Sequence, residues 1–247
     1  MINRKVSNLL VEIGNTAVKA AWSEGPVLGK TFRYQGEKAM DFISSLTEKQ
    51  VPTVLAVVSG RSISAEEEKT LGASCQFLMI LDPAHPDVLS SYGLPEYLSY
   101  DRASSIVAAK YLFKGKSCTV FDLGTTLTVD FIDESGTYRG GNISLGCRTR
   151  FKALNRYSKA LPLVNVPSSD KFPGDSEKSS IESGVISGIM FEIDGYIRSN
   201  PENIMIFTGG DAIYFAKKMK NSIFVVCNLG LIGLAIITDE YVKKNVQ

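Results

Sequence analysis

The chain has 247 residues, 44% of them hydrophobic, and its 27 basic side chains nearly balance its 26 acidic ones, for a net charge of +1. This length and apolar content allow one large domain or two small ones with packed cores. The balanced charge argues against recognition by bulk charge, so we expect no nucleic-acid partner and no membrane partner. The longest apolar runs, such as 53–58 and 223–227, have the length of strands and fall far short of a membrane span.

The beginning of the chain and the cysteines indicate a cytoplasmic protein. Residues 1–8 are polar, and the apolar residues behind them soon meet Glu12, which predicts no signal peptide. The single histidine, His85, has prolines on both sides, which predicts a surface loop rather than a metal cluster. The four cysteines form no CxxC pair, and we expect them to be buried and reduced: Cys75, Cys118, Cys147 and Cys227.

Strand-like and helix-like segments alternate through the first half of the chain, which indicates an α/β architecture. Helical spacing of apolar residues predicts helices over 38–49 and from Asp101 to Phe113. The predicted strands are a three-stranded meander and two buried strands: 8–13, 17–22, 28–34, 53–60 and 77–81.

The second half of the chain begins with the same pattern as the first. An apolar strand, an acid, a glycine, a hydroxyl and a second strand occur at 8–22 and again in the stretch 117–143. We interpret the repeat as a duplicated domain, with an N-terminal domain over 1–115 and a C-terminal domain over 116–247. Two unrelated hairpins are the alternative, because glycine turns between strands are common.

Three further segments follow in the second half. Residues 161–178 are rich in Pro, Ser, Asp and Gly and predict a long ordered loop. Apolar residues at helical spacing predict a helix over 179–197. Within 203–219, a strand ends at Gly209-Gly210 and a second helix begins.

The three glycine turns suggest a polyphosphate site. Backbone N–H groups of glycine-containing turns bind phosphate, aided by hydroxyls and a carboxylate that holds a metal. Two facing hairpins could hold the phosphates, and the Gly209-Gly210 turn would let a purine lie against backbone. Each turn alone is a weak signal, since ordinary strand and turn chemistry explains it equally well.

In these motifs the chain resembles the type III pantothenate kinases, members of the actin-like, ribonuclease-H-like kinase superfamily. The resemblance extends over nearly the whole chain. In chain order it includes IGNT (13–16), YGLP to YDR (92–102), DLGTT (122–126), GGNISLG (140–146), ALN (153–155), LPLVNVP to G (161–174), SGVISG (183–188) and TGGDA (208–212).

The resemblance implies two tandem ribonuclease-H-like (actin-like ATPase) domains with a cleft between them. It also implies an enzyme that transfers the γ-phosphoryl group of ATP to pantothenate, forming 4'-phosphopantothenate in the first step of coenzyme A biosynthesis. Mg²⁺, a monovalent cation (K⁺ or NH₄⁺) and a homodimer are implied with it.

The resemblance also assigns roles to individual residues. It makes Asp101 the general base, with Asp122 and Glu12 at the metal positions. Residues expected to contact ATP are Glu12, Gly14, Asn15, Thr16, Lys19, Thr125, Gly209 and Gly210. Residues expected at the pantothenate site are Tyr92, Ser99, Tyr100, Arg102, Gly141, Gly146 and Glu177.

Each role has a simpler structural alternative. Aspartate is a favoured helix N-cap, so Asp101 could merely cap the helix that begins there. Tyr92 could be an ordinary loop tyrosine, and the glycines could be strand ends and turns.

The chain also departs from the family pattern at four places. Glu12 replaces an aspartate, Ser99-Tyr100 replaces glycine and a small residue, Leu145 replaces a proline, and Ser176-Glu177 replaces an Asn-Thr pair. Two alternatives to pantothenate phosphorylation therefore stay open: an actin-like kinase for another small hydroxyl-bearing acceptor, and a catalytically weakened or non-catalytic paralogue that acts as a nucleotide-binding or regulatory protein.

Overall fold

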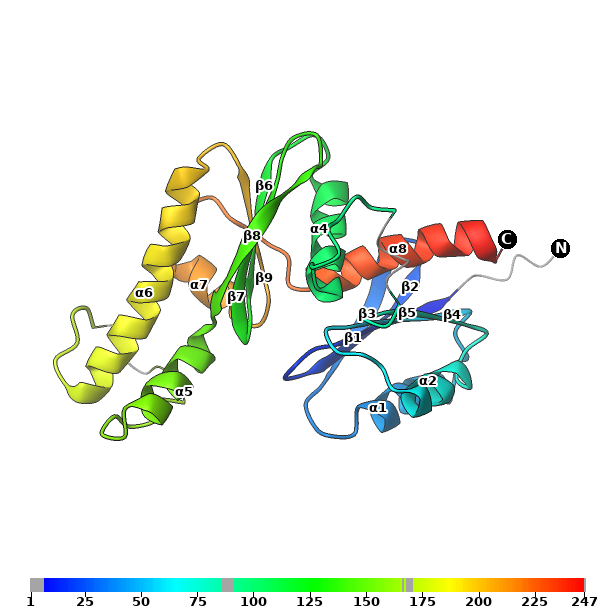
Figure 1. The fold of residues 1–247 in the computed structure, drawn as a ribbon, viewed down its shortest axis with the longest axis horizontal. Helices are drawn as coiled ribbons and strands as arrows, with labels where there is room; N and C mark the ends of the chain where they lie inside the picture. Colours follow the sequence, from blue (N-terminus) through cyan, green and yellow to red (C-terminus); the bar gives the residue numbers. More distant parts are fainter. Residues whose placement is uncertain (1–6, 86–90, 166, 168–170, 247) are drawn as a thin grey trace. The chain divides into compact units, whose positions relative to one another are not determined.

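The computed structural model describes residues 7–85, 91–165, 167 and 171–246 (Figure 1). Two compact units divide the chain: unit 1 comprises Met1–Lys114 with Asn228–Gln247, and unit 2 comprises Gly115–Cys227. The predicted division into 1–115 and 116–247 differs from these units at the end of the chain. There, residues 228–247 group with unit 1.

Unit 1 contains a five-stranded sheet in the order β3-β2-β1-β4-β5. β1, β2 and β3 form the predicted antiparallel meander, whereas β4 and β5 run parallel to β1. The carboxyl ends of β1, β4 and β5 therefore meet at one edge of the sheet. The strands are β1 (Asn8–Ile13), β2 (Val18–Glu24), β3 (Val27–Tyr34), β4 (Val54–Ser59) and β5 (Phe77–Leu81).

Helices cover both faces of this sheet, which explains why every residue of β4 is buried. Leu9 and Val11 pack in a core with Ile43 of α1 and Leu71 of α2. Because side chains alternate along a strand, Glu12 faces the other side, where α4 and α8 pack. The helices are α1 (Ala39–Thr47), α2 (Ala65–Gly72), α4 (Tyr100–Leu112) and α8 (Leu229–Asn245).

Unit 2 contains a second five-stranded sheet, in the order β10-β9-β6-β7-β8. β6, β7 and β8 form an antiparallel meander, and β9 pairs with β6 in parallel. The two units thus repeat one arrangement, as the repeated motif predicted. The strands are β6 (Cys118–Leu123), β7 (Thr126–Ile132), β8 (Tyr138–Leu145), β9 (Ile204–Thr208) and β10 (Phe224–Val225).

Three helices pack against this sheet: α5 (Cys147–Tyr157), α6 (Glu177–Ser199) and α7 (Ala212–Lys218). Their core residues include Phe151, Ile189 and Phe215, which pack with Phe121 and Val129 of the strands. The apolar stripe predicted on α6 is confirmed, because Ile186, Ile189, Ile193 and Ile197 are all buried. The helix begins at Glu177, so the loop predicted over 161–178 is shorter than expected.

Three of the described helices have no counterpart among the sequence predictions. α2 buries only Leu71, so its sequence carries little apolar periodicity. α5 buries Cys147 and Phe151, which have helical spacing that the sequence interpretation missed. α8 has the opposite character, since nine of its residues are buried and its start is almost continuously apolar. An apolar run of that kind does not separate a buried helix from a buried strand.

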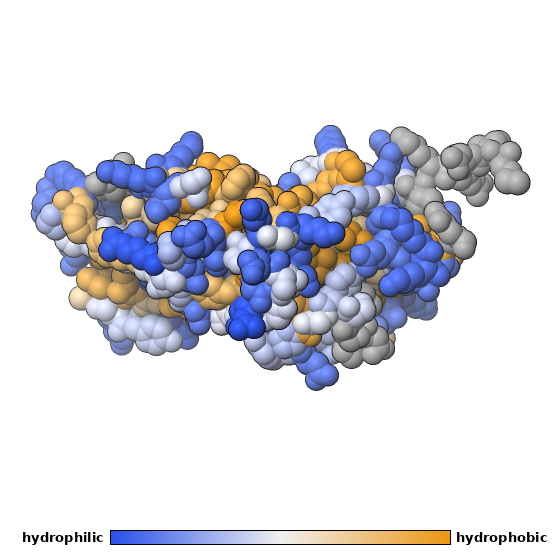
Figure 2. Space-filling model, turned by 90° about the horizontal axis from the view of Figure 1, so that it is seen from above, coloured by the Kyte–Doolittle hydropathy of each residue, from blue (hydrophilic) through white to orange (hydrophobic). Residues whose placement is uncertain are grey.

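The surface and the cysteines complete the description. Cys118 and Cys147 are buried as predicted, but Cys75 is only half-buried and Cys227 is exposed, just after the two-residue strand β10. Among the described residues, no helix is long and apolar enough to cross a membrane. Figure 2 shows one face of the molecule, where hydrophilic residues are interspersed with smaller apolar areas.

Candidate functional site

The glycine turn of unit 1 lies where it was predicted, between β1 and β2. The Gly14 N–H donates to the Ala17 carbonyl over 3.1 Å, which closes the turn. Gly14, Asn15 and Thr16 are exposed there, so their backbone and side chains are open to a ligand. The turn stands at the carboxyl end of β1, the edge at which open α/β sheets bind ligands.

Glu12 forms an ion pair next to this turn. Glu12 on β1 and Lys19 on β2 are direct cross-strand partners, and Lys19 Nζ lies 3.0 Å from Glu12 Oε1. The two side chains are largely buried, with 17% of Glu12 and 27% of Lys19 exposed. Glu12 is therefore held in one place by its neighbour.

Glu12 also lies close to two helices of unit 1. A Cβ placed on Gly230 of α8 would lie 3.0 Å from Glu12 Oε2 and 3.7 Å from Ser105 Oγ of α4. Gly230 is in the first turn of α8, whose partial positive charge stabilises a carboxylate. Ser105 follows Asp101 by one helical turn, so the fold brings Glu12 close to the second turn of α4.

Asp101 is the second residue of α4 and is not its N-cap. The N-cap is Ser99, which has extended backbone and makes no side-chain capping bond. Asp101 Oδ1 instead accepts a hydrogen bond from the Arg102 backbone N–H over 2.9 Å. The side chain is exposed and in the first turn, so its negative charge is both favourable for the helix and accessible.

Tyr92 is anchored to the helices of unit 1. Its hydroxyl donates to Glu240 Oε2 of α8 over 2.6 Å, and Lys110 Nζ of α4 donates to its carbonyl over 3.3 Å. Burial, followed by the Glu240 carboxylate, raises the pKa of the Tyr92 hydroxyl. The phenol therefore stays protonated and fixes the chain that leads into Ser99 and Asp101.

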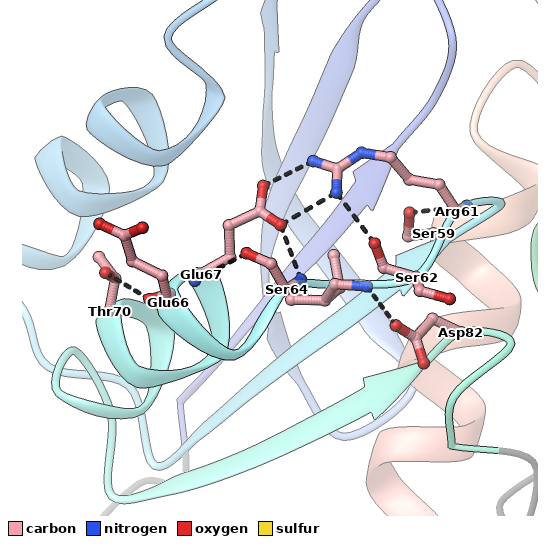
Figure 3. A network of polar contacts seen from close by, with 9 residues as sticks. Ser59, Arg61, Ser62, Ser64, Glu66, Glu67, Thr70 and Asp82 are labelled. Atoms are coloured by element: carbon pink, nitrogen blue, oxygen red, sulfur yellow. Dashed lines mark hydrogen bonds and ion pairs between the residues drawn. The ribbon is translucent and has the colours of Figure 1, made fainter.

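A hydrogen-bonded loop follows β4 at the same sheet edge (Figure 3). Arg61 makes two contacts with the Glu67 carboxylate, at 3.0 and 2.6 Å, and the Ile63 N–H donates to buried Asp82 over 2.5 Å. The hydrogen bond from Arg61 to Glu67 lowers the pKa of the Glu67 carboxyl to about 2. His85 also contacts Asp82, at 2.7 Å, so the predicted surface histidine is tied to the sheet edge.

In unit 2, Asp122 lies against the Gly209 turn. Gly209 has φ +91°, and a Cβ there would overlap the Asp122 carboxylate and lie 2.6 Å from the Leu123 carbonyl oxygen. Only glycine adopts this backbone and leaves this space. The Asp211 N–H then donates to the Leu123 carbonyl over 2.9 Å, which joins the end of β6 to the turn before α7.

The second glycine turn, Gly124-Thr125, packs against Gly146. The Gly146 N–H donates to the Thr125 carbonyl over 3.1 Å, and a Cβ on Gly146 would lie 2.8 Å from that same oxygen. Thr125 is exposed at this turn. The structure thus brings a residue predicted to contact ATP together with one predicted at the acceptor site.

Two acceptor residues predicted in unit 2 lie apart from these turns in the sequence. Gly141 is on the exposed edge strand β8, opposite Asp130. Glu177 is the exposed first residue of α6, after a capping box formed by Ser176 and Ser179.

The residues at the two predicted metal positions carry suitable ligands. Mg²⁺ is typically held by one or two carboxylates together with phosphates, and Glu12 supplies such a carboxylate. Among the described residues, no three His, Cys, Asp or Glu side chains gather as a metal site.

For a monovalent cation, the Asp122 carboxylate is accompanied by a second oxygen. Thr128 is its direct cross-strand partner, and the buried Thr128 hydroxyl has no hydrogen-bond partner among the described residues. Partnered residues lie on the same face of a sheet. An oxygen-lined position of this kind fits a hard cation.

A cavity of about 350 Å³ lies elsewhere in unit 2, between α6, the segment before it and α7. Its apolar lining includes Ile186 and Met190, with Lys171 and Lys218 also contributing. None of the catalytic or binding residues predicted from the sequence lines this cavity.

The sequence interpretation missed several residues that shape the site. Gly230 was not considered because α8 was not predicted. Asp211 was passed over although it follows Gly209-Gly210 directly, and burial raises the pKa of its carboxyl while Arg148 opposes the change. The signal in the sequence was the position of Asp211, an acid that directly follows the glycine pair at the end of a strand.

Comparisons with known proteins give a consistent result. Residues 8–199 match a family model described as type III pantothenate kinase. A protein of Flavobacterium johnsoniae named type III pantothenate kinase is 36% identical over 234 residues, which cover 92% of this chain and 95% of that protein.

Solved structures agree on the fold. A conserved protein of Campylobacter jejuni, titled a Baf family transcriptional activator, is 21% identical with a TM-score of 0.60, covering 96% of this chain and 98% of that one. The activator of the 2-hydroxyisocaproyl-CoA dehydratase from Clostridium difficile, with bound ADPNP, is 11% identical with a TM-score of 0.59, covering 97% of each chain. The predicted fold of two tandem actin-like ATPase domains is confirmed.

Proposed function

This chain belongs to the type III pantothenate kinase family, and on that premise we propose that it phosphorylates pantothenate with ATP, the first step of coenzyme A biosynthesis. The observation that carries the proposal is the match over 8–199, which contains two of the three glycine turns, Gly14-Asn15-Thr16 and Gly124-Thr125, and the first turn of α4. The position of Glu12 near Ser105, one helical turn after Asp101 on α4, supports it further.

In the proposed reaction, Asp101 accepts the proton of the primary hydroxyl of pantothenate. The hydroxyl oxygen then bonds to the γ-phosphorus of ATP, the bond to the bridging oxygen breaks, and ADP leaves with the electron pair. Phosphoryl transfer needs mainly positioning and charge neutralisation, so a single accessible carboxylate is sufficient as base. We assign Arg102, beside Asp101, to the carboxylate of pantothenate.

The nucleotide is assigned to the glycine turns. The exposed turn Gly14-Asn15-Thr16 and the Gly124-Thr125 turn would offer backbone N–H groups and hydroxyls to phosphate oxygens. Lys19, held by Glu12, would add positive charge beside the first turn. Mg²⁺ at Glu12 and K⁺ or NH₄⁺ at Asp122 would, when bound, neutralise phosphate charge.

The acceptor is assigned to Tyr92, Ser99 and Tyr100 of unit 1, next to Asp101, and to Gly141, Gly146 and Glu177 of unit 2. We further propose that the enzyme is cytoplasmic and forms a homodimer. Light scattering after size-exclusion chromatography would test the homodimer.

The test is ADP release with ATP, Mg²⁺ and pantothenate, compared in sodium, potassium and ammonium salts. We expect turnover that rises when potassium or ammonium replaces sodium. No ADP release with pantothenate in any of these salts would refute the proposal. Turnover with a different hydroxyl-bearing acceptor would then select another kinase activity, and nucleotide binding without turnover would select a regulatory paralogue.

The assignment of Asp101 has its own test. Asp101→Asn keeps the size of the side chain but removes the base, so we expect turnover to fall about 10²- to 10⁴-fold. Asp41→Asn is the matched control, because Asp41 is an exposed aspartate in the first turn of α1. We expect Asp41→Asn to keep the wild-type rate, and equal rates for the two variants would remove Asp101 from catalysis.

A further inference from the structure

The carbonyl of Thr125 is held from two directions. It accepts a hydrogen bond of 3.1 Å from the Gly146 N–H and a second of 2.6 Å from the Thr149 hydroxyl. Thr149 belongs to the first turn of α5, which begins directly after Gly146. A side chain of α5 thus contacts the turn to which we assign the nucleotide phosphates.

Fixing this carbonyl also fixes the direction of a donor. The Thr125 carbonyl and the Thr126 N–H belong to one planar trans peptide and point in opposite directions. With the carbonyl directed at Thr149 and Gly146, the Thr126 N–H is turned away from α5. Backbone N–H groups are the donors that bind phosphate at such turns, so their orientation determines affinity.

Arg150 holds the segment that contacts the Thr125 carbonyl, namely Leu145 and Gly146. Its Nε donates to the Leu145 carbonyl over 2.7 Å, immediately before Gly146. Its guanidinium also pairs with Glu192 of α6, and Glu192 accepts a 2.7 Å hydrogen bond from the Ser144 hydroxyl. Arg150 and Glu192 are only 23% and 24% exposed, so solvent competes little with this network.

We propose that Thr149 and Arg150 are positioning residues for the Gly124-Thr125 turn and set the affinity of the protein for nucleotide phosphates. Thr149 binds the turn directly, whereas Arg150 keeps Leu145 and Gly146 in place against it. The inference rests on the proposed function only in assigning phosphates to this turn.

The experiment measures binding of AMP-PNP with Mg²⁺ in potassium buffer by calorimetry, without an acceptor. Thr149→Val removes the hydroxyl but keeps the branched shape, and we expect the dissociation constant to rise about three- to tenfold, the value of one hydrogen bond. Thr149→Ser keeps the hydroxyl and is expected to restore wild-type affinity. In turnover, Thr149→Val should raise the KM for ATP and leave the KM for pantothenate unchanged.

The matched control is Thr70→Val. Thr70 is an exposed helical threonine whose hydroxyl donates to the Glu66 carbonyl of α2, in unit 1. We expect Thr70→Val and Thr149→Val to have similar melting temperatures, and only the latter to bind AMP-PNP weakly. If Thr149→Val alone melts early, Arg150→Lys is compared instead, since it keeps the charge but loses the Nε bond to Leu145.

Three outcomes would overturn the inference. They are wild-type affinity in both Thr149→Val and Arg150→Lys, an affinity loss that Thr149→Ser does not restore, and a wild-type protein that does not bind AMP-PNP. Binding of AMP-PNP without pantothenate turnover would refute the proposed activity and leave this inference standing.

Discussion

At the scale of single residues, Glu12 is the departure from the family pattern that the structure explains best. A glutamate reaches about 1.5 Å further than an aspartate, roughly one carbon–carbon bond. That reach is used here, because the carboxylate lies between Lys19 on β2 and Gly230 on α8. Gly230 leaves room for the longer side chain, since a Cβ there would come within 3.0 Å of Glu12 Oε2.

Glu12→Asp tests whether this longer acid is accommodated. The shorter side chain would withdraw from Lys19, so we expect kcat/KM for ATP to fall about tenfold, in the range for a lost charge-assisted hydrogen bond. Steady-state kinetics at saturating pantothenate measures this. Glu48→Asp, at the exposed end of α1, is the control for the same change. A faster Glu12→Asp enzyme would mean that Glu12 is misplaced for the reaction.

At the scale of elements, the packing of α4 on α8 places the candidate base relative to Glu12. The two helices are in close contact at Gly233, where a Cβ would overlap the Ser104 carbonyl of α4. Because that neighbour is backbone, it moves only if the helix moves. The contact at Gly233 therefore fixes the distance between the helix that carries Asp101 and the helix whose first turn faces Glu12.

Gly233→Ala should force these helices apart. We expect the free energy of unfolding to fall by about 1–3 kcal/mol or more, the usual effect of overpacking, as measured by urea denaturation. Gly195→Ala is the matched control on α6, because Gly195 is exposed and has no atom within 4 Å of its built Cβ. There, alanine should stabilise by about 0.5–1 kcal/mol through its helix propensity. Equal effects at both positions would contradict close packing at Gly233.

At the scale of the whole molecule, the two units differ in how the chain builds them. Unit 2 is one continuous segment with its own core. Unit 1 needs both ends of the chain, since α8 contributes buried Leu229, Leu231, Leu234 and Ile237 from beyond unit 2.

Two fragments test this difference. The fragment 115–227 keeps its whole core and is expected to fold alone, with a cooperative thermal transition in circular dichroism. The fragment 1–114 lacks α8, which leaves the apolar face of α4 exposed, and is expected to lack such a transition. A folded 1–114 fragment would show that α8 is dispensable for unit 1.

Much of the fold could be predicted from the sequence, because local signals repeat. Apolar strand-length runs and glycine turns predicted the meander of unit 1 and the repeated hairpin of unit 2, and the apolar stripe predicted α6. α2 was missed because it buries only one side chain, and α8 because its start is uniformly apolar. α5 was missed although its buried Cys147 and Phe151 have helical spacing. A periodic pattern of apolar residues indicates a helix or strand that is buried on one face. It therefore does not reveal an element whose burial is slight or complete.

The candidate site divides in the same way. The sequence by itself determined which glycine turns and acids recur, since a turn that approaches phosphate needs glycine whatever surrounds it. Only the tertiary structure decided that Glu12 pairs with Lys19 and lies against α8, that Ser99 and not Asp101 caps α4, and that Thr149 holds the Thr125 carbonyl. These contacts join residues from different elements or depend on backbone geometry, and no local pattern encodes which side chains meet when sheets and helices pack.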